Sequence, residues 1–81
     1  MDNDKRVNKI NIKCYDIPPN EKLRNMKLDF HKADFWYLKG YDHYHSINNE
    51  LESAIDSYRQ AIRLNPFLVD AMHNLACSYE E

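Results

Sequence analysis

The side chains best suited to chemistry are two cysteines and four histidines. His73 and Cys77 stand four residues apart, so on a helix they would share one face and could supply two ligands to a metal. A closed zinc site needs about four ligands, and the chain has no Cys-x-x-Cys or His-x-x-x-His spacing. Nucleophilic catalysis would also need an oxyanion hole and a third group, and neither is visible beside these two residues. The sequence therefore predicts no metal, no cofactor and no enzymatic activity.

Length and composition set the class of protein. The chain has 81 residues, of which 43% are hydrophobic and 30% charged, as in one small globular domain. It contains a single glycine, which excludes a glycine-rich phosphate loop and favours helices over a turn-rich β fold. No apolar run approaches the roughly 20 residues of a membrane span, and the first residues lack the apolar core of a secretory signal. With only two cysteines we expect no disulfide framework, and we expect a cytoplasmic protein.

Residues 1–19 predict a basic, extended arm. Ile10, Ile12 and Cys14 alternate with polar residues, which suits a short strand or an extended docked segment, and Pro18-Pro19 ends the pattern. Residues 1–32 carry eight basic and five acidic residues, whereas residues 33–81 carry three and eight. We do not expect a nucleic-acid partner, because the basic residues are interleaved with acids and no aromatic series accompanies them.

Helical periodicity covers the rest of the chain. Asn20 is a predicted cap of a leading helix over residues 20–32, whose stripe is Leu23, Met26, Phe30 and Ala33; this helix either continues past Ala33 or breaks there. Trp36, Gly40 and Tyr44 follow at four-residue spacing. A capping box of Asn49 and Glu52 is predicted to begin the next helix, which Asn65-Pro66 ends. The last stripe consists of Leu68, Met72, Leu75, Ala76 and Tyr79.

Residues 33–81 resemble the tetratricopeptide repeat, a helix–turn–helix unit of about 34 residues. The matching positions are Trp36 and Gly40 in a first helix, and Leu51, Ala54, Tyr58, Ala61 and Pro66 in a second helix and its exit. Lys39 and His43 depart from the pattern, and the turn near residues 45–49 carries a two-residue insertion. The resemblance implies an all-α fold of antiparallel helix–turn–helix repeats, with one repeat over 33–68 and the first helix of an incomplete repeat over 69–81. Small residues, namely Gly40, Ala54, Ala61 and Ala76, would then sit at close helix crossings.

The resemblance also implies a function as a scaffold for protein–protein interaction. Repeats of this kind bind partner segments on a concave face formed by their first helices. The implied partner-binding residues are Asp34, Tyr37, Tyr41, Tyr44, Asp70, His73, Asn74 and Cys77, with His45 beside them. Tyr37 and Tyr41 have an alternative role, packing against the leading helix.

The acidic balance of residues 33–81 favours a neutral or basic protein or peptide partner. Further repeats beyond Glu81, or another chain, are expected to cover the last helix. The alternative function is that of a small structural subunit, which would dock in a larger assembly through its N-terminal arm.

Overall fold

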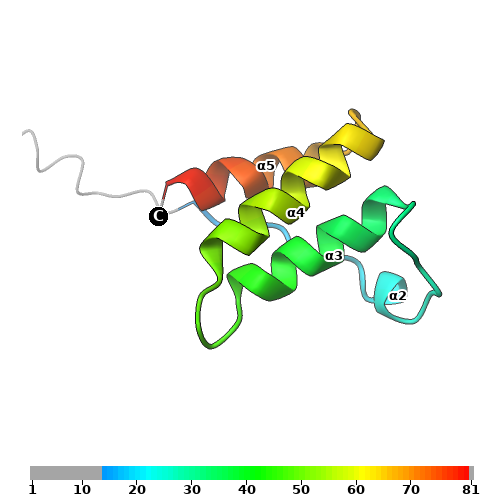
Figure 1. Cartoon of the computed structure of the whole chain (residues 1–81), viewed down its shortest axis with the longest axis horizontal. Coiled ribbons are helices and arrows are strands. Elements are labelled where there is room, and N and C mark those ends of the chain that lie inside the picture. The colour runs from blue at the N-terminus through cyan, green and yellow to red at the C-terminus, as the bar shows by residue number, and fades with distance from the viewer. Residues whose placement is uncertain (1–13, 81) are drawn as a thin grey trace, which may run out of the picture.

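The computed structural model describes residues 14–80, and this part of the chain is all-α, with no strand (Figure 1). Its helices are α2 (Glu21–Arg24), α3 (Ala33–Tyr44), α4 (Leu51–Leu64) and α5 (Val69–Tyr79). α4 lies between α3 and α5 and packs against both, and successive long helices run antiparallel (Figure 1). The predicted alternation at Ile10 and Ile12 lies outside the described residues.

The core forms where these three helices meet. It consists of two tyrosines and three alanines, namely Tyr37, Ala54, Tyr58, Ala61 and Ala71. Tyr58 is fully buried, and a Cβ atom added to Gly40 would lie 2.6 Å from two carbons of its ring. The prediction that small residues allow close approach is therefore confirmed for Gly40, and Ala54 and Ala61 are fully buried in the core, whereas Ala76 is exposed.

The ends of α4 test two sequence predictions. The stop at Asn65-Pro66 is confirmed, because α4 ends at Leu64 with Asn65 as its C-cap. The capping box of Asn49 and Glu52 is wrong: Asn49 has a left-handed φ of 50°, and the N-cap is Glu50, with no side-chain capping bond. The N–H of the N-cap residue Glu50 donates instead to the carbonyl oxygen of His43, in the preceding turn, at 3.1 Å.

The predicted helix over residues 20–32 is wrong beyond Arg24. Asn20 does cap its start, since its Oδ1 accepts the Lys22 N–H at 2.8 Å, but α2 ends after one turn and α3 begins separately at Ala33. Within the apolar stripe of the predicted helix, Leu23 packs against the core, whereas Met26 and Phe30 are more than half exposed. Without packing along a face, a short helix does not offset its nucleation cost.

α5 presents two different faces. The helix buries small and polar side chains, namely Ala71, Asn74, Cys77 and Ser78. Part of the predicted apolar stripe faces outward instead, because Met72 and Tyr79 are exposed and lie on the same helix as exposed Val69. No helix within residues 14–80 is long and apolar enough to cross a membrane.

Candidate functional site

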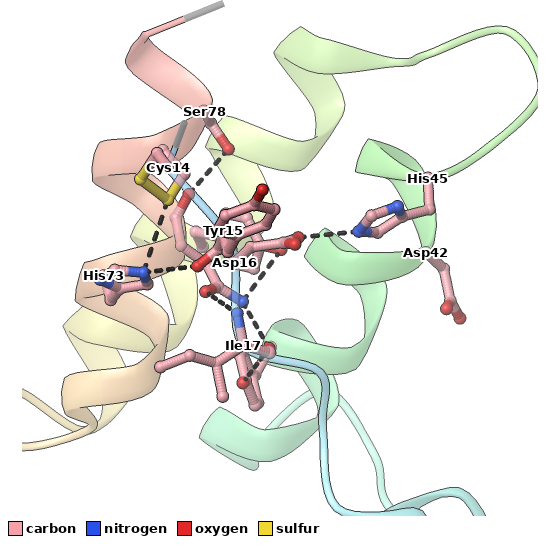
Figure 2. A network of polar contacts seen from close by, with 12 residues as sticks. Cys14, Tyr15, Asp16, Ile17, Asp42, His45, His73 and Ser78 are labelled. Carbon is pink, nitrogen blue, oxygen red and sulfur yellow. Dashed lines mark hydrogen bonds and ion pairs between the residues drawn. A yellow bond between two sulfur atoms is a disulfide. The ribbon is translucent and has the colours of Figure 1, made fainter. Parts of the chain in front are cut away.

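Residues 14–17 run as an extended segment across α3 and α5, and we call the surface that they cover the groove (Figure 2). Figure 2 shows this segment between the two helices, with side chains from both reaching it. Pro18 and Pro19 follow directly and favour extended backbone, so the segment enters the groove without helical structure.

Asn74 of α5 contacts both backbone polar groups of one residue in the segment. Its Oδ1 accepts the Ile17 N–H at 2.7 Å, and its Nδ2 donates to the Ile17 carbonyl oxygen at 2.8 Å. The Tyr37 hydroxyl of α3 donates to the same carbonyl at 2.6 Å. Asn74 is only 1% exposed, and its Nδ2 lies 3.5 Å from the Tyr58 hydroxyl. The amide is therefore held in a fixed position and contacts backbone atoms, which every non-proline residue offers.

Two histidines extend these contacts along the segment. The Nε2 atom of His73 lies 2.8 Å from the Tyr15 carbonyl oxygen. The Nε2 atom of His45 lies 2.8 Å from Oδ2 of Asp16, whose side chain is 13% exposed. The groove thus contacts the backbone at Tyr15 and Ile17 and the side chain at Asp16, as the alternating directions of an extended chain allow.

A disulfide joins the segment to the groove. Cys14 bonds to Cys77 of α5 across 63 residues of sequence, and Cys77 is 1% exposed. The cysteine count predicts no disulfide framework, and the structure differs in joining the two cysteines by one disulfide. A count of two cysteines does not reveal whether the fold brings them together. Here the docked segment places Cys14 over α5, within bonding distance of Cys77.

Both core tyrosines remain protonated as hydrogen-bonding groups. Burial raises the pKa of Tyr37 well above its ordinary value, and the nearby Asp70 carboxylate raises it further. Burial likewise raises the pKa of Tyr58, although a hydrogen bond with Asn74 lowers it in part. The Tyr37 hydroxyl is therefore a stable donor to the Ile17 carbonyl across the ordinary pH range.

The predicted partner-binding residues fall into two sets. Tyr37, His73, Asn74 and Cys77 all contact residues 14–17. Tyr41 and Tyr44 are half-buried and lie beside His45, with ring centroids 4.3 and 5.0 Å away. Asp34 is half-buried, and Asp70 is exposed and acts on Tyr37 through its charge.

The occupant of the groove is what the sequence did not identify. Cys14, Tyr15, Asp16 and Ile17 carry no helical periodicity, and their contacts with α5 span 57 residues or more. The only signals were the apolar alternation ending at Cys14 and the two prolines, which indicated an extended segment but not its location.

No protein-family model, curated protein or solved structure matches the chain.

Proposed function

We propose that this chain is a protein-interaction module that binds an extended partner segment in the groove between α3 and α5. The observation that carries the proposal is the pair of hydrogen bonds from Asn74 to the N–H and the carbonyl oxygen of Ile17. A buried amide held in this way recognises an extended backbone whatever its side chains are. The proposal does not include an enzymatic activity.

The arrangement of the helices supports a scaffold of the tetratricopeptide kind. An antiparallel α3–α4 hairpin is followed, after Pro66, by α5, so the groove lies between helices that would be the first helices of successive repeats. The exposed side chains on and before α5, which include Phe67 at 85% and Val69 at 66%, support the further proposal that more repeats or another chain cover this helix.

Residues 14–17 indicate what the partner segment would offer. It would have an extended backbone with a free N–H at the position of Ile17, and an acidic side chain could pair with His45 from the position of Asp16. The remainder of a partner segment would be neutral or basic, because residues 33–81 are acidic overall. We place the module in the cytoplasm on the sequence alone, and in that compartment the Cys14–Cys77 disulfide would be reduced.

The chain's own segment must leave before a partner can bind. A tethered segment competes at an effective concentration in the millimolar range, and the disulfide adds a covalent hold. The alternative role, a structural subunit that docks through its N-terminal arm, would have to use residues 1–13, because residues 14–17 are engaged within the chain.

A full-length chain with a weakened internal segment tests the proposal. Cys14→Ser removes the disulfide, Asp16→Ala removes the contact with His45, and Ile17→Pro removes the N–H that donates to Asn74, so the internal segment competes less, while every groove side chain of α3 and α5 remains. A fluorescent peptide with the sequence of residues 13–20, carrying serine at position 14, should bind this chain and compete with the unlabelled peptide. Fluorescence anisotropy measures the affinity.

Asn74→Ala in the same chain should weaken peptide binding by about thirtyfold, since two hydrogen bonds contribute roughly 2 kcal/mol together. Asn48→Ala is the matched control, because Asn48 is an exposed turn residue away from the groove, and it should leave the affinity unchanged. Circular dichroism checks that each variant is folded, and Asn74→Asp, which keeps the acceptor but loses the donor, replaces an unfolded Asn74→Ala. Equal affinities for the Asn74 and Asn48 variants would contradict the proposal.

A further inference from the structure

Three possible metal ligands meet where the segment crosses α5. The sulfur atoms of Cys14 and Cys77 and a ring nitrogen of His73 all lie within 4.8 Å of one another (Figure 2). His73 and Cys77 lie one turn apart on one face of α5, and Cys14 comes from the other end of the described chain. We propose that, once the disulfide is reduced, these three side chains bind a zinc-class divalent ion.

The spacing of His73 and Cys77 already matches such a site. A tetrahedral zinc ion with a nitrogen at about 2.05 Å and a sulfur at about 2.3 Å holds these two atoms roughly 3.6 Å apart. The Nε2 atom of His73 lies 3.6 Å from Sγ of Cys77. An ion placed between them therefore needs no movement of α5.

Cys14 is the ligand that must adjust. Two thiolates on one zinc ion lie about 3.8 Å apart, so the sulfurs that are bonded in the disulfide must separate. Cys14 stands on the extended segment rather than on a helix, so rotation of its side chain can supply this movement. Cys77 is 1% exposed and fixed in α5, whereas His73 is exposed, so the remaining coordination position would face solvent.

Reduction of the disulfide and binding of the ion are two separate steps. A dithiol reductant transfers two electrons and two protons to the Cys14–Cys77 bond, which gives two thiols and leaves the reductant as a disulfide. Binding of Zn²⁺ then releases the two thiol protons to solvent and forms two sulfur–zinc bonds. His73 coordinates through the Nε2 lone pair with its proton on Nδ1, so its hydrogen bond to the Tyr15 carbonyl is lost. Two thiolates and one imidazole are a ligand set that suits zinc.

Such a site explains how one pair of cysteines can serve the segment in both redox conditions. In an oxidising compartment the disulfide holds residues 14–17 in the groove, and in a reducing one disulfides are rare. The ion would then link the same segment to α5. The sequence predicted no metal because only two of the three ligands have recognisable spacing.

Cobalt binding to the full-length chain tests the site. The chain is reduced with a phosphine, which is then kept in excess, and Co²⁺ is added as the probe. We expect one equivalent to produce the near-ultraviolet thiolate-to-cobalt charge-transfer band and the intense visible bands of tetrahedral coordination, and Zn²⁺ to remove both. Neither band should form in the oxidised chain.

Variants assign the ligands. Cys14→Ser should abolish the tetrahedral spectrum, and because Cys14 lies on the segment outside the helices, this variant should stay folded by circular dichroism. His73→Ala should weaken cobalt binding by at least about tenfold, since even outer-shell changes at metal sites cost about 10–100-fold. His31→Ala, an exposed histidine in the turn before α3, should bind as the wild type does. A reduced wild type without the charge-transfer band, or a Cys14→Ser chain with the same spectrum, would overturn the site; equal affinities for the two histidine variants would remove His73 from it.

Discussion

Gly40 of α3 lies directly against the Tyr58 ring of α4, and Gly40→Ala tests whether that contact sets the packing of the hairpin. An added Cβ would lie 2.6 Å from Cδ1 and Cε1 of Tyr58 and 3.1 Å from its Cγ. The contacting atoms belong to a ring that is 0% exposed, so the ring cannot turn away into solvent. Either the ring or the helix axis must therefore shift.

Two effects of opposite sign decide how much Gly40→Ala changes the free energy of unfolding. In an open helix position, alanine in place of glycine stabilises a helix by about 1 kcal/mol. Overpacking a filled core typically costs about 1–3 kcal/mol, and the 2.6 Å approach to a fully buried ring favours the upper part of that range. After the helix gain is subtracted, we expect the free energy of unfolding to fall by about 1–2 kcal/mol, and the melting temperature to fall by roughly 5–15 °C for a domain of this size.

Thermal unfolding followed by circular dichroism measures the change. Ser53→Ala, at an exposed position in α4, is the matched control and should leave the melting temperature unchanged or raise it slightly. A double variant that adds Tyr58→Leu should lose less stability than the sum of the two single losses, because the clash needs the ring. If Gly40→Ala raises the melting temperature as Ser53→Ala does, helix propensity dominates and the close-approach reasoning is wrong.

Other expectations follow from the core and the disulfide. Ala61→Leu, at a position that is 0% exposed, should lower the free energy of unfolding by about 1–3 kcal/mol in a urea titration, whereas Ala76→Leu on the exposed face should be nearly neutral. Reducing the disulfide, whose cysteines are 63 residues apart, should lower the same quantity by up to about 4 kcal/mol; urea titrations with and without a dithiol, both with a chelator, measure the difference. The raised pKa values of Tyr37 and Tyr58 mean that these phenols ionise first in the unfolded chain, so their contribution to stability should be constant below about pH 10 and fall above it. Tyrosinate absorbance should then show these two phenols titrating only as the chain unfolds; titration of all tyrosines before unfolding would contradict this.

The long helices could be predicted because their signals are local. Apolar spacing along α4 and the stop at Asn65-Pro66 lie within one stretch of chain, and the structure confirms both. The same type of signal was misleading over residues 20–32, where Met26 and Phe30 have helical spacing but remain exposed. Periodicity indicates that a helix could bury a face, but not that a partner for this face exists.

The site could be predicted only on its helical side. Tyr37 and Asn74 were identified as groove residues from their positions in the repeat pattern. Their contact, Ile17, was not identified, and neither was Asp16, which His45 contacts. A contact between a residue near one end of the chain and α5 leaves no mark in local sequence. The pairing of the two cysteines depends on that same docking, so it could not be foreseen either.

The docking of residues 14–17 on α5 also has a consequence for the order of folding. Its contacts join residues 57 to 63 positions apart, whereas α3, α4 and α5 are joined by short turns. Because distant contacts carry a larger loop-closure cost, the helical hairpin should form first and the segment should dock late. Substitutions at Asn74 should then speed unfolding more than they slow folding. During each folding event the groove would exist for a short time before its own segment arrives, and a partner segment already present would meet it open.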